Sequence, residues 1–168
     1  MSMSINGLVT RSNNDDFSWQ SKEDKEHFLK LKSQYSLIIM GRKTYDYIRH
    51  KLVLDPKMLR VVVTHHPDRY SSNQINNQLE FINLDPITLV HNLETRGFKK
   101  ALLAGGPNIA TQFLNCHLIN EIYLTIEPII ISYGIKIFEI PNEEKMTLIE
   151  SKTLNSKGAL ILNYKINK

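Results

Sequence analysis

Two short apolar segments of the sequence end in glycine and lead directly into helix-like segments. They are Ile39-Met40-Gly41-Arg42-Lys43-Thr44 and Leu103-Ala104-Gly105-Gly106-Pro107-Asn108. Glycine lets the backbone approach an anion closely, and the free amides of a following helix donate hydrogen bonds to it. Arg42 and Lys43 add positive charge, and the Thr44 hydroxyl can donate to a phosphate oxygen. Either turn alone is more simply a tight strand–helix connection, but two at equivalent ends of neighbouring strands favour a diphosphate ligand.

A third apolar segment, Val61-Val62-Val63, leads into Thr64-His65-His66-Pro67. If it lies beside the first segment, His65 or His66 together with Arg42 would hold the 2′-phosphate that distinguishes NADP from NAD. Two solvated histidines before a proline turn are the alternative, and both interpretations stay open. The sequence contains neither GxGxxG nor GxxxxGK[ST], so the usual dinucleotide and P-loop fingerprints are absent.

Asp24 is the most informative acidic residue. Ser21-Lys22-Glu23-Asp24 has the form of a capping box, with Ser21 as N-cap and Asp24 at the third helical position, and this structural role alone would account for Asp24. Three residues follow it at helical spacing and form an apolar stripe: Phe28, Leu31 and Tyr35. The Asp24 carboxylate should therefore face inward, where it is costly without a partner or a ligand. Asp24 is for this reason also a candidate for site chemistry.

Other kinds of chemistry find little support in the composition. The six histidines form no HExxH pattern and no cluster with cysteine, so no metal is expected, and His27 should lie on a helix surface. The single cysteine, Cys116, excludes an internal disulfide and fits a reducing cytoplasm. The net charge of +4 is dispersed, so no nucleic acid partner is expected. No apolar run has the length of a membrane span and no signal peptide is evident, so no membrane partner is expected.

The order of the segments predicts an α/β fold, and 168 residues are enough for one domain, residues 1–168. Four short apolar runs are typical of strands buried on both faces: residues 37–40, 61–63, 101–104 and 122–126. Helices are expected near residues 21–32, 43–48, 86–96 and 107–115. This alternation implies a mostly parallel sheet between helices. Residues 148–151 and 160–164, joined through Asn155-Ser156-Lys157-Gly158, predict an antiparallel C-terminal hairpin.

The spacing of several motifs resembles that of dihydrofolate reductases. Trp19, Asp24 and Phe28 are placed like that family's tryptophan, catalytic acid and substrate-packing phenylalanine. Met40-Gly41-Arg42-Lys43-Thr44-Tyr45 resembles its cofactor-binding turn, and Gly105-Gly106 its paired glycines. Tyr123-Leu124-Thr125 is similar to its late strand, whose threonine bonds the catalytic acid.

The flanking segments are closer to a sister group, the reductase domain of the riboflavin-biosynthesis deaminase/reductase. Ser4-Ile5-Asn6-Gly7 is similar to its Ser-Leu-Asp-Gly start, and Trp19-Gln20-Ser21 to its Trp-x-Ser. The stretch from Ala104 through Glu121 to Pro128 follows its long C-terminal pattern, so the resemblance runs over most of the chain.

The resemblance implies a dihydrofolate-reductase-like three-layer sandwich and an NADPH-dependent reductase that transfers hydride to a small pteridine- or pyrimidine-type substrate. Dihydrofolate and the riboflavin-pathway ribosylaminouracil phosphate are the substrate types it suggests. It assigns Asp24 and Thr125 to catalysis, and Ser4, Trp19 and Phe28 to the substrate. It assigns the cofactor to Gly41, Arg42, Lys43, Thr44, Thr64, His65, Gly105, Gly106, Pro107, Asn108 and Ile109. A cis peptide between the paired glycines and a homodimer are further implications.

Three departures qualify the resemblance. Where dihydrofolate reductases have an arginine that clamps the glutamate tail of folate, this chain has Met58, preceded by Lys57, which argues against ordinary dihydrofolate. Ser132-Tyr133-Gly134 replaces the Gly-x-Gly of the riboflavin type. Only Met1–Ser4 remain of the family's first strand, so that either the natural start lies upstream or this form is less stable; both alternatives stay open.

Two rival functions remain. A non-catalytic NADP-binding domain would keep the nucleotide pocket without turnover. A basic RNA- or DNA-binding protein is the weaker rival, and its affinity would fall steeply with ionic strength.

Overall fold

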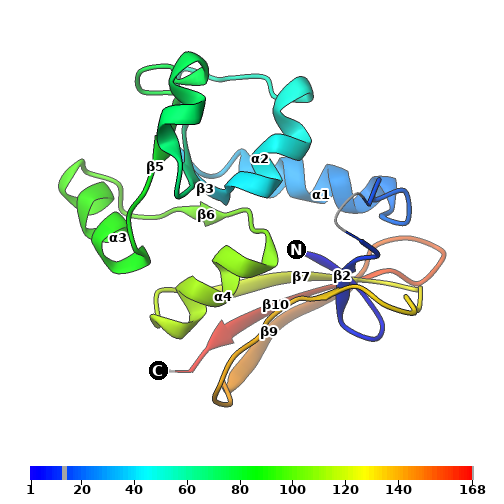
Figure 1. Ribbon diagram of the computed structural model, residues 1–168. Helices are drawn as coiled ribbons and strands as arrows, with labels where there is room; N and C mark the ends of the chain where they lie inside the picture. The colour runs from blue at the N-terminus through cyan, green and yellow to red at the C-terminus, as the bar shows by residue number, and fades with distance from the viewer. Residues whose placement is uncertain (13–14, 168) are drawn as a thin grey trace. The chain divides into compact units, whose positions relative to one another are not determined.

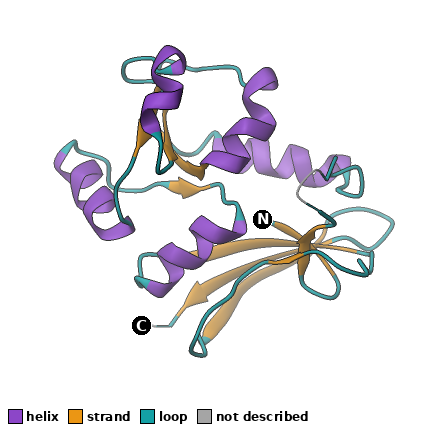
Figure 2. Ribbon diagram, in the orientation of Figure 1, coloured by secondary structure: helices purple, strands orange, loops and turns teal. Residues whose placement is uncertain are grey.

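The computed structural model describes residues 1–12 and 15–167, and its helices and strands are shown in Figures 1 and 2. The chain divides into two compact units. The first unit combines the two ends of the chain, Met1–Lys30 and His117–Lys168, and the second unit is Leu31–Cys116. A single domain over residues 1–168 stays a prediction. Over the described residues, every helix is too short or too polar to cross a membrane.

The second unit is built on a four-stranded parallel sheet in the order β5-β4-β3-β6. Its strands are β3 (Leu37–Gly41), β4 (Leu59–Val63), β5 (Leu79–Ile82) and β6 (Leu102–Leu103). Its helices are α2 (Arg42–Ile48), α3 (Pro86–Thr95) and α4 (Pro107–Asn115), with the 3₁₀ turns η1 (Arg49–Lys51) and η2 (Pro67–Asn73). Parallel neighbours require such helical crossovers, because a tight turn cannot join them.

The two central strands of this sheet, β3 and β4, are buried along four of their five residues. Continuous burial explains why residues 37–40 and 61–63 read in the sequence as unbroken apolar runs, although β4 also buries Arg60. Three aromatic rings pack against one another. The Tyr70 ring stacks on the Phe81 ring with 4.8 Å between their centroids, and the Tyr45 ring meets Phe81 edge-on with 4.9 Å between centroids. Tyr45 lies in α2 and Tyr70 in η2. This packing therefore anchors both elements against the sheet.

The first unit contains a mixed sheet in the order β1-β7-β10-β9. β1 (Ser2–Ser4) runs parallel to β7 (Glu121–Glu127), while β10 (Leu160–Ile166) is antiparallel to both β7 and β9 (Met146–Thr153). A small second sheet pairs β2 (Leu8–Thr10) with β8 (Ile135–Lys136). Helix α1 (Lys22–Lys32) begins in this unit. Although β1 has only three residues, it keeps a register with β7 in which Ser2 pairs with Thr125 and Ser4 with Glu127.

Most of the predicted elements are confirmed. The α/β fold, the parallel sheet and the C-terminal hairpin are present, and α4 covers the residues expected of it. The burial expected of residues 122–126 on both faces is wrong, because Ile122, Tyr123 and Leu124 are only half-buried in β7. Residues 122–126 also do not join the parallel sheet of β3, β4 and β6. They lie in β7, which pairs with β1 and β10 in the mixed sheet. Strand β5 was not among the predicted elements.

Gly134 lies where the chain passes very close to the end of β2. A Cβ added at Gly134 would overlap the backbone carbonyl oxygen of Thr10, and backbone cannot move aside as a flexible side chain can. We therefore expect Gly134→Ala to lower the free energy of unfolding by about 1–3 kcal/mol, which urea denaturation would measure. Ser132→Ala, at an exposed neighbouring position, is the control and should change it by less than about 0.5 kcal/mol. Equal effects of the two substitutions would contradict the close approach as the cause.

Candidate active site

The two glycine turns predicted from the sequence meet in the second unit. β3 and β6 are adjacent parallel strands, with Ile39 in register with Leu103. Beyond their ends, the Gly41 amide donates to the Gly105 carbonyl at 2.9 Å. Gly105 has a φ of +88° and is joined to Gly106 by a cis peptide, as the resemblance implied. The predicted alignment of the two turns is confirmed.

Side chains of Ile109 and Thr44 lie close to the two glycine turns. A Cβ on Gly41 would lie 3.6 Å from Ile109 Cγ2, and a Cβ on Gly106 would lie 3.4 Å from Thr44 Oγ1. Gly106 is the N-cap residue of α4, and among the described residues no side chain caps this helix start. Its first internal hydrogen bond runs from the Ala110 amide to the Gly106 carbonyl at 3.1 Å. The backbone amides of Asn108 and Ile109 therefore precede the helical ladder and can donate to a bound anion.

Arg42 lies at the start of α2 with its guanidinium already oriented. Its Nη1 lies 2.7 Å from Asp46 Oδ2, one turn along the helix, and the side chain is 44% exposed. The Tyr70 hydroxyl donates to the same carboxylate at 3.0 Å. Interaction with Asp46 raises the pKa of Arg42, so the guanidinium stays charged. Lys43 is exposed on the next position.

The third predicted turn follows β4. His65 and His66 are exposed. Exposure agrees both with two solvated histidines and with histidines that are accessible to a phosphate, so it does not decide between the two interpretations. Thr64 is only 6% exposed, and its hydroxyl accepts from the His66 amide at 3.2 Å. The Thr64 side chain therefore stabilises its own turn, and this burial does not support the cofactor contact assigned to it.

The start of α1 carries the predicted acid. Asp24 is 8% exposed, which confirms that it faces inward. Its carboxylate accepts from Ser2 Oγ of β1 at 2.5 Å. Its backbone amide donates to Ser21 Oγ at 3.2 Å, so Ser21 is the N-cap as predicted. In a complete capping box the Asp24 side chain would accept from the Ser21 N–H, but here the acceptor is the side chain of another residue.

That other residue is Glu127, at the end of β7, which the sequence did not single out. Glu127 is 3% exposed, and its Oε1 accepts both from the Ser21 amide at 2.8 Å and from Ser21 Oγ at 2.6 Å. The two residues are separated by 106 positions, so no local pattern links them. An acidic residue ending an apolar strand was the only available signal.

Thr125 and Ser4 make contacts other than those the resemblance implied, and the roles assigned to them stay predictions. Thr125 was expected to bond the acid, but among the described residues that hydrogen bond comes from Ser2, the register partner of Thr125 in β1. Thr125 is 3% exposed and lies beside Ser2, since partners in register share a sheet face. Ser4 was expected to contact substrate, but it is fully buried. Its hydroxyl donates to Asn6 at 2.8 Å and accepts from the Leu8 amide at 3.0 Å, so it shapes the turn after β1.

His27, one helical turn after Asp24, also differs from expectation. Its Nε2 is buried and has no hydrogen-bond partner among the described residues, although a surface position was predicted. Burial lowers the pKa of His27, and the Asp24 charge opposes that shift. The imidazole beside Asp24 is therefore neutral near pH 7. Phe28, the next residue, is 39% exposed and available to a ligand.

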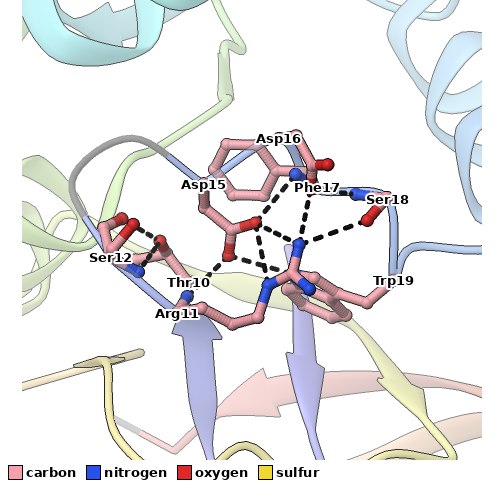
Figure 3. A network of polar contacts seen from close by, with 8 residues as sticks. All are labelled: Thr10, Arg11, Ser12, Asp15, Asp16, Phe17, Ser18 and Trp19. Atoms are coloured by element: carbon pink, nitrogen blue, oxygen red, sulfur yellow. Dashed lines mark hydrogen bonds and ion pairs between the residues drawn. The ribbon is translucent and has the colours of Figure 1, made fainter.

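Trp19 is held by a network of polar contacts between β2 and α1 (Figure 3). Trp19 Nε1 donates to Asp15 Oδ2 at 3.2 Å, and Arg11 donates to Asp15 through its backbone amide at 2.5 Å and its Nη2 at 2.9 Å. The Phe17 amide donates to Asp15 Oδ1 at 2.9 Å. Burial acts to raise the pKa of Asp15, but these hydrogen bonds outweigh it and hold that pKa well below its usual range. The indole is thus fixed by an ionised carboxylate.

The chain belongs to the RibD C-terminal domain family, whose pattern matches residues 1–159. It is 24% identical over 176 residues to the uncharacterized protein YyaP of Bacillus subtilis (strain 168), covering 99% of this chain and 93% of that protein. The fold is similar to that of a putative riboflavin biosynthesis protein from Shewanella sp. PV-4, with a TM-score of 0.79, 18% identity, and coverage of 100% of this chain and 97% of that one.

The fold is also similar to that of Enterococcus faecalis dihydrofolate reductase complexed with NADP(H) and RAB-propyl. The TM-score is 0.65 at 15% identity, over 99% of this chain and 94% of that one. These likenesses confirm the dihydrofolate-reductase-like fold that the sequence motifs implied. Within the described residues, no group of three histidine, cysteine or acidic side chains could hold a metal ion.

The Asp15 network predicts a pH-dependent contribution to stability. The pKa of Asp15 is lower in the folded state than the usual value of about 3.9, so its contribution is complete above pH 5 and declines as the pH falls. We expect Asp15→Asn to lower the free energy of unfolding at pH 7 by about 1.5–3 kcal/mol. Between pH 7 and pH 3 that difference should shrink by about 1 kcal/mol, because only the wild type loses the carboxylate's contribution.

Urea denaturation of both proteins at the two pH values measures this change. Asp68→Asn, at an exposed position outside this network, is the control and should change the free energy of unfolding by less than about 0.5 kcal/mol at either pH. A wild-type–variant difference that stays constant with pH would contradict the role of an ionised Asp15.

Proposed function

We propose that this chain is an NADPH-dependent reductase that transfers hydride to a small pteridine- or pyrimidine-type heterocycle. The observation that carries this proposal is the buried Asp24 carboxylate, which receives one side-chain hydrogen bond, from Ser2, among the described residues. A carboxylate offers about four acceptor sites, so most of its capacity is left for a ligand. An amidine-like edge of a heterocyclic ring, with two parallel N–H groups, suits that capacity.

The residues of the second unit fit a dinucleotide. Gly41, Gly105 and Gly106 leave the backbone without side chains, and the first amides of α4 are uncapped. Arg42 supplies a charged guanidinium for a phosphate, and exposed His65 follows the neighbouring strand. When bound, NADPH supplies the hydride. This chain's own residues bind the cofactor and orient the substrate, so the expected contribution of the protein is mostly positioning.

The first unit supplies the residues for the substrate. Asp24 would anchor the ring, Phe28 would pack on its face, and Trp19 is fixed near the start of α1 by Asp15. The similarity to dihydrofolate reductase and to a putative riboflavin biosynthesis protein supports a heterocycle of this class.

Ordinary dihydrofolate fits less well than a smaller heterocycle or its ribosyl derivative. Met58, where an arginine would clamp the glutamate tail, is 6% exposed and packs in the core of the second unit. Arg60 of β4, two residues further on, is buried, and it donates to the backbone carbonyls of Met58 at 3.4 Å and Val53 at 3.1 Å. Neither side chain can therefore reach out to a substrate carboxylate.

An absorbance assay tests the activity directly. The protein is mixed with NADPH and either dihydrofolate or the riboflavin-pathway aminopyrimidine, and loss of reduced-cofactor absorbance is followed. We expect turnover of the aminopyrimidine type and little of dihydrofolate. Tight NADPH binding without turnover of either substrate would favour a non-catalytic NADP-binding domain.

The role of Asp24 gives a specific prediction. Asp24→Asn keeps the shape of the side chain but removes the anion that holds the substrate ring, so the rate should fall by about 10²-fold or more. NADPH affinity, measured by fluorescence titration, should stay within about twofold. Asp85→Asn is the matched control, because Asp85 caps α3 and asparagine caps equally well. Equal loss of rate and NADPH affinity in Asp24→Asn would assign the residue a structural role only.

Arg42 gives a second prediction. Arg42→Ala removes the guanidinium proposed to bind the 2′-phosphate, so NADPH binding should weaken by about 10-fold or more while NADH binding changes little. Titration of both cofactors against wild type and variant measures the two effects. Arg49→Ala, at an exposed arginine just after the same helix, should change neither. An equal loss for both cofactors would remove Arg42 from the 2′-phosphate role.

A further inference from the structure

We propose that Glu127 is a positioning residue that keeps the Asp24 carboxylate free for the substrate. This inference rests on the proposed function, because it assigns a cause to the orientation of the proposed acid. The observation behind it is the pair of hydrogen bonds from the Ser21 amide and hydroxyl to one oxygen of Glu127, at 2.8 and 2.6 Å.

The start of α1 offers a competing partner for Asp24. The first backbone N–H groups of a helix lack intrahelical acceptors, and a glutamate or glutamine at the third helical position reaches back to the N-cap amide in a capping box. Ser21 and Asp24 have that spacing, and one half of the capping box is formed by the Asp24 amide and Ser21 Oγ at 3.2 Å. With no other acceptor for Ser21 N–H, the Asp24 side chain would complete the box. It would then turn away from Ser2.

Glu127 removes that competition. Its Oε1 occupies the acceptor position at Ser21 N–H, so Asp24 bonds Ser2 Oγ at 2.5 Å. The register of β1 and β7 makes both contacts compatible, because Ser2 pairs with Thr125 and Ser4 pairs with Glu127. Thr125 and Glu127 lie two residues apart and share a face of the sheet. The same strand pair therefore provides the partner of Asp24 and the partner of Ser21.

The position also suits the charge of Glu127. A carboxylate at a helix N-terminus interacts favourably with the helix dipole, and Glu127 is 3% exposed, so this interaction is little screened. Both hydrogen bonds reach the same oxygen, which a glutamine could also supply through its carbonyl. Geometry and charge can therefore be separated by substitution.

Two variants test the proposal. Glu127→Leu removes the acceptor, so Asp24 should turn to Ser21 N–H, and kcat for reduction should fall about 10- to 100-fold with NADPH affinity unchanged. Glu127→Gln keeps an acceptor oxygen and should retain kcat within about threefold. Asp85→Ala, which removes the cap of α3, is the control for loss of a helix cap and should leave kcat within about twofold.

Each outcome bears on the proposal. A fall in kcat for Glu127→Gln as large as for Asp24→Asn would overturn it, and this variant decides the matter even if Glu127→Leu does not fold. Retained kcat in folded Glu127→Leu would overturn it as well. A crystal structure of Glu127→Leu gives a readout without turnover. Asp24 bound to Ser21 N–H supports the inference even if the proposed reaction fails, whereas Asp24 still on Ser2 contradicts it.

Discussion

Backbone N–H groups at helix starts must find acceptors, and this constraint governs the residues to which function is assigned in both units. At α1, the serine cap and a glutamate from a distant strand take up the donors of the first turn. Among the described residues, the carboxylate of the acid on that turn accepts one side-chain hydrogen bond, from the Ser2 hydroxyl, and its charge interacts with the buried Met1 ammonium. Its orientation is thus a consequence of how the helix start is satisfied, and not of the acid's own preference for a cap.

At α4 the first backbone N–H groups are not taken up by a side chain among the described residues. The N-cap of this helix is Gly106, proline occupies its first position, and no side chain caps it among the described residues. Proline removes one donor that would have needed a partner, and the amides that follow remain for a ligand. The parallel pairing of β3 with β6 sets the neighbouring glycine turn against this site through the Gly41–Gly105 hydrogen bond. At the start of α1 the N–H groups of Ser21 and Asp24 bond to side chains of the protein, whereas at the start of α4 the uncapped amides can bind an anion.

Local patterns predicted much of this and missed what depends on distant partners. The Gly-Gly-Pro start and the apolar spacing of α4 were sufficient to define the helix over Pro107–Asn115. Strand β5 was missed because Glu80 interrupts an apolar run of only four residues. The inward position of Asp24 followed from helical spacing, but its partner Ser2 and the acceptor Glu127 depend on the β1–β7 register. Because this register pairs residues more than a hundred positions apart, no local sequence pattern predicts it.

The buried carboxylates of the first unit show how hydrogen-bond satisfaction separates structural from functional acids. Asp15 accepts five hydrogen bonds, from the Arg11, Phe17 and Trp19 donors, and its pKa lies well below the usual range as a result. Glu127 accepts two strong bonds at a helix start. A carboxylate so engaged gains little from a ligand, because binding would first break existing bonds. Asp24 is as well buried but receives one such bond. A buried acceptor left with spare capacity is costly in the free protein, and that cost falls when a substrate donates to it, which favours substrate binding at Asp24 over the two better-satisfied acids.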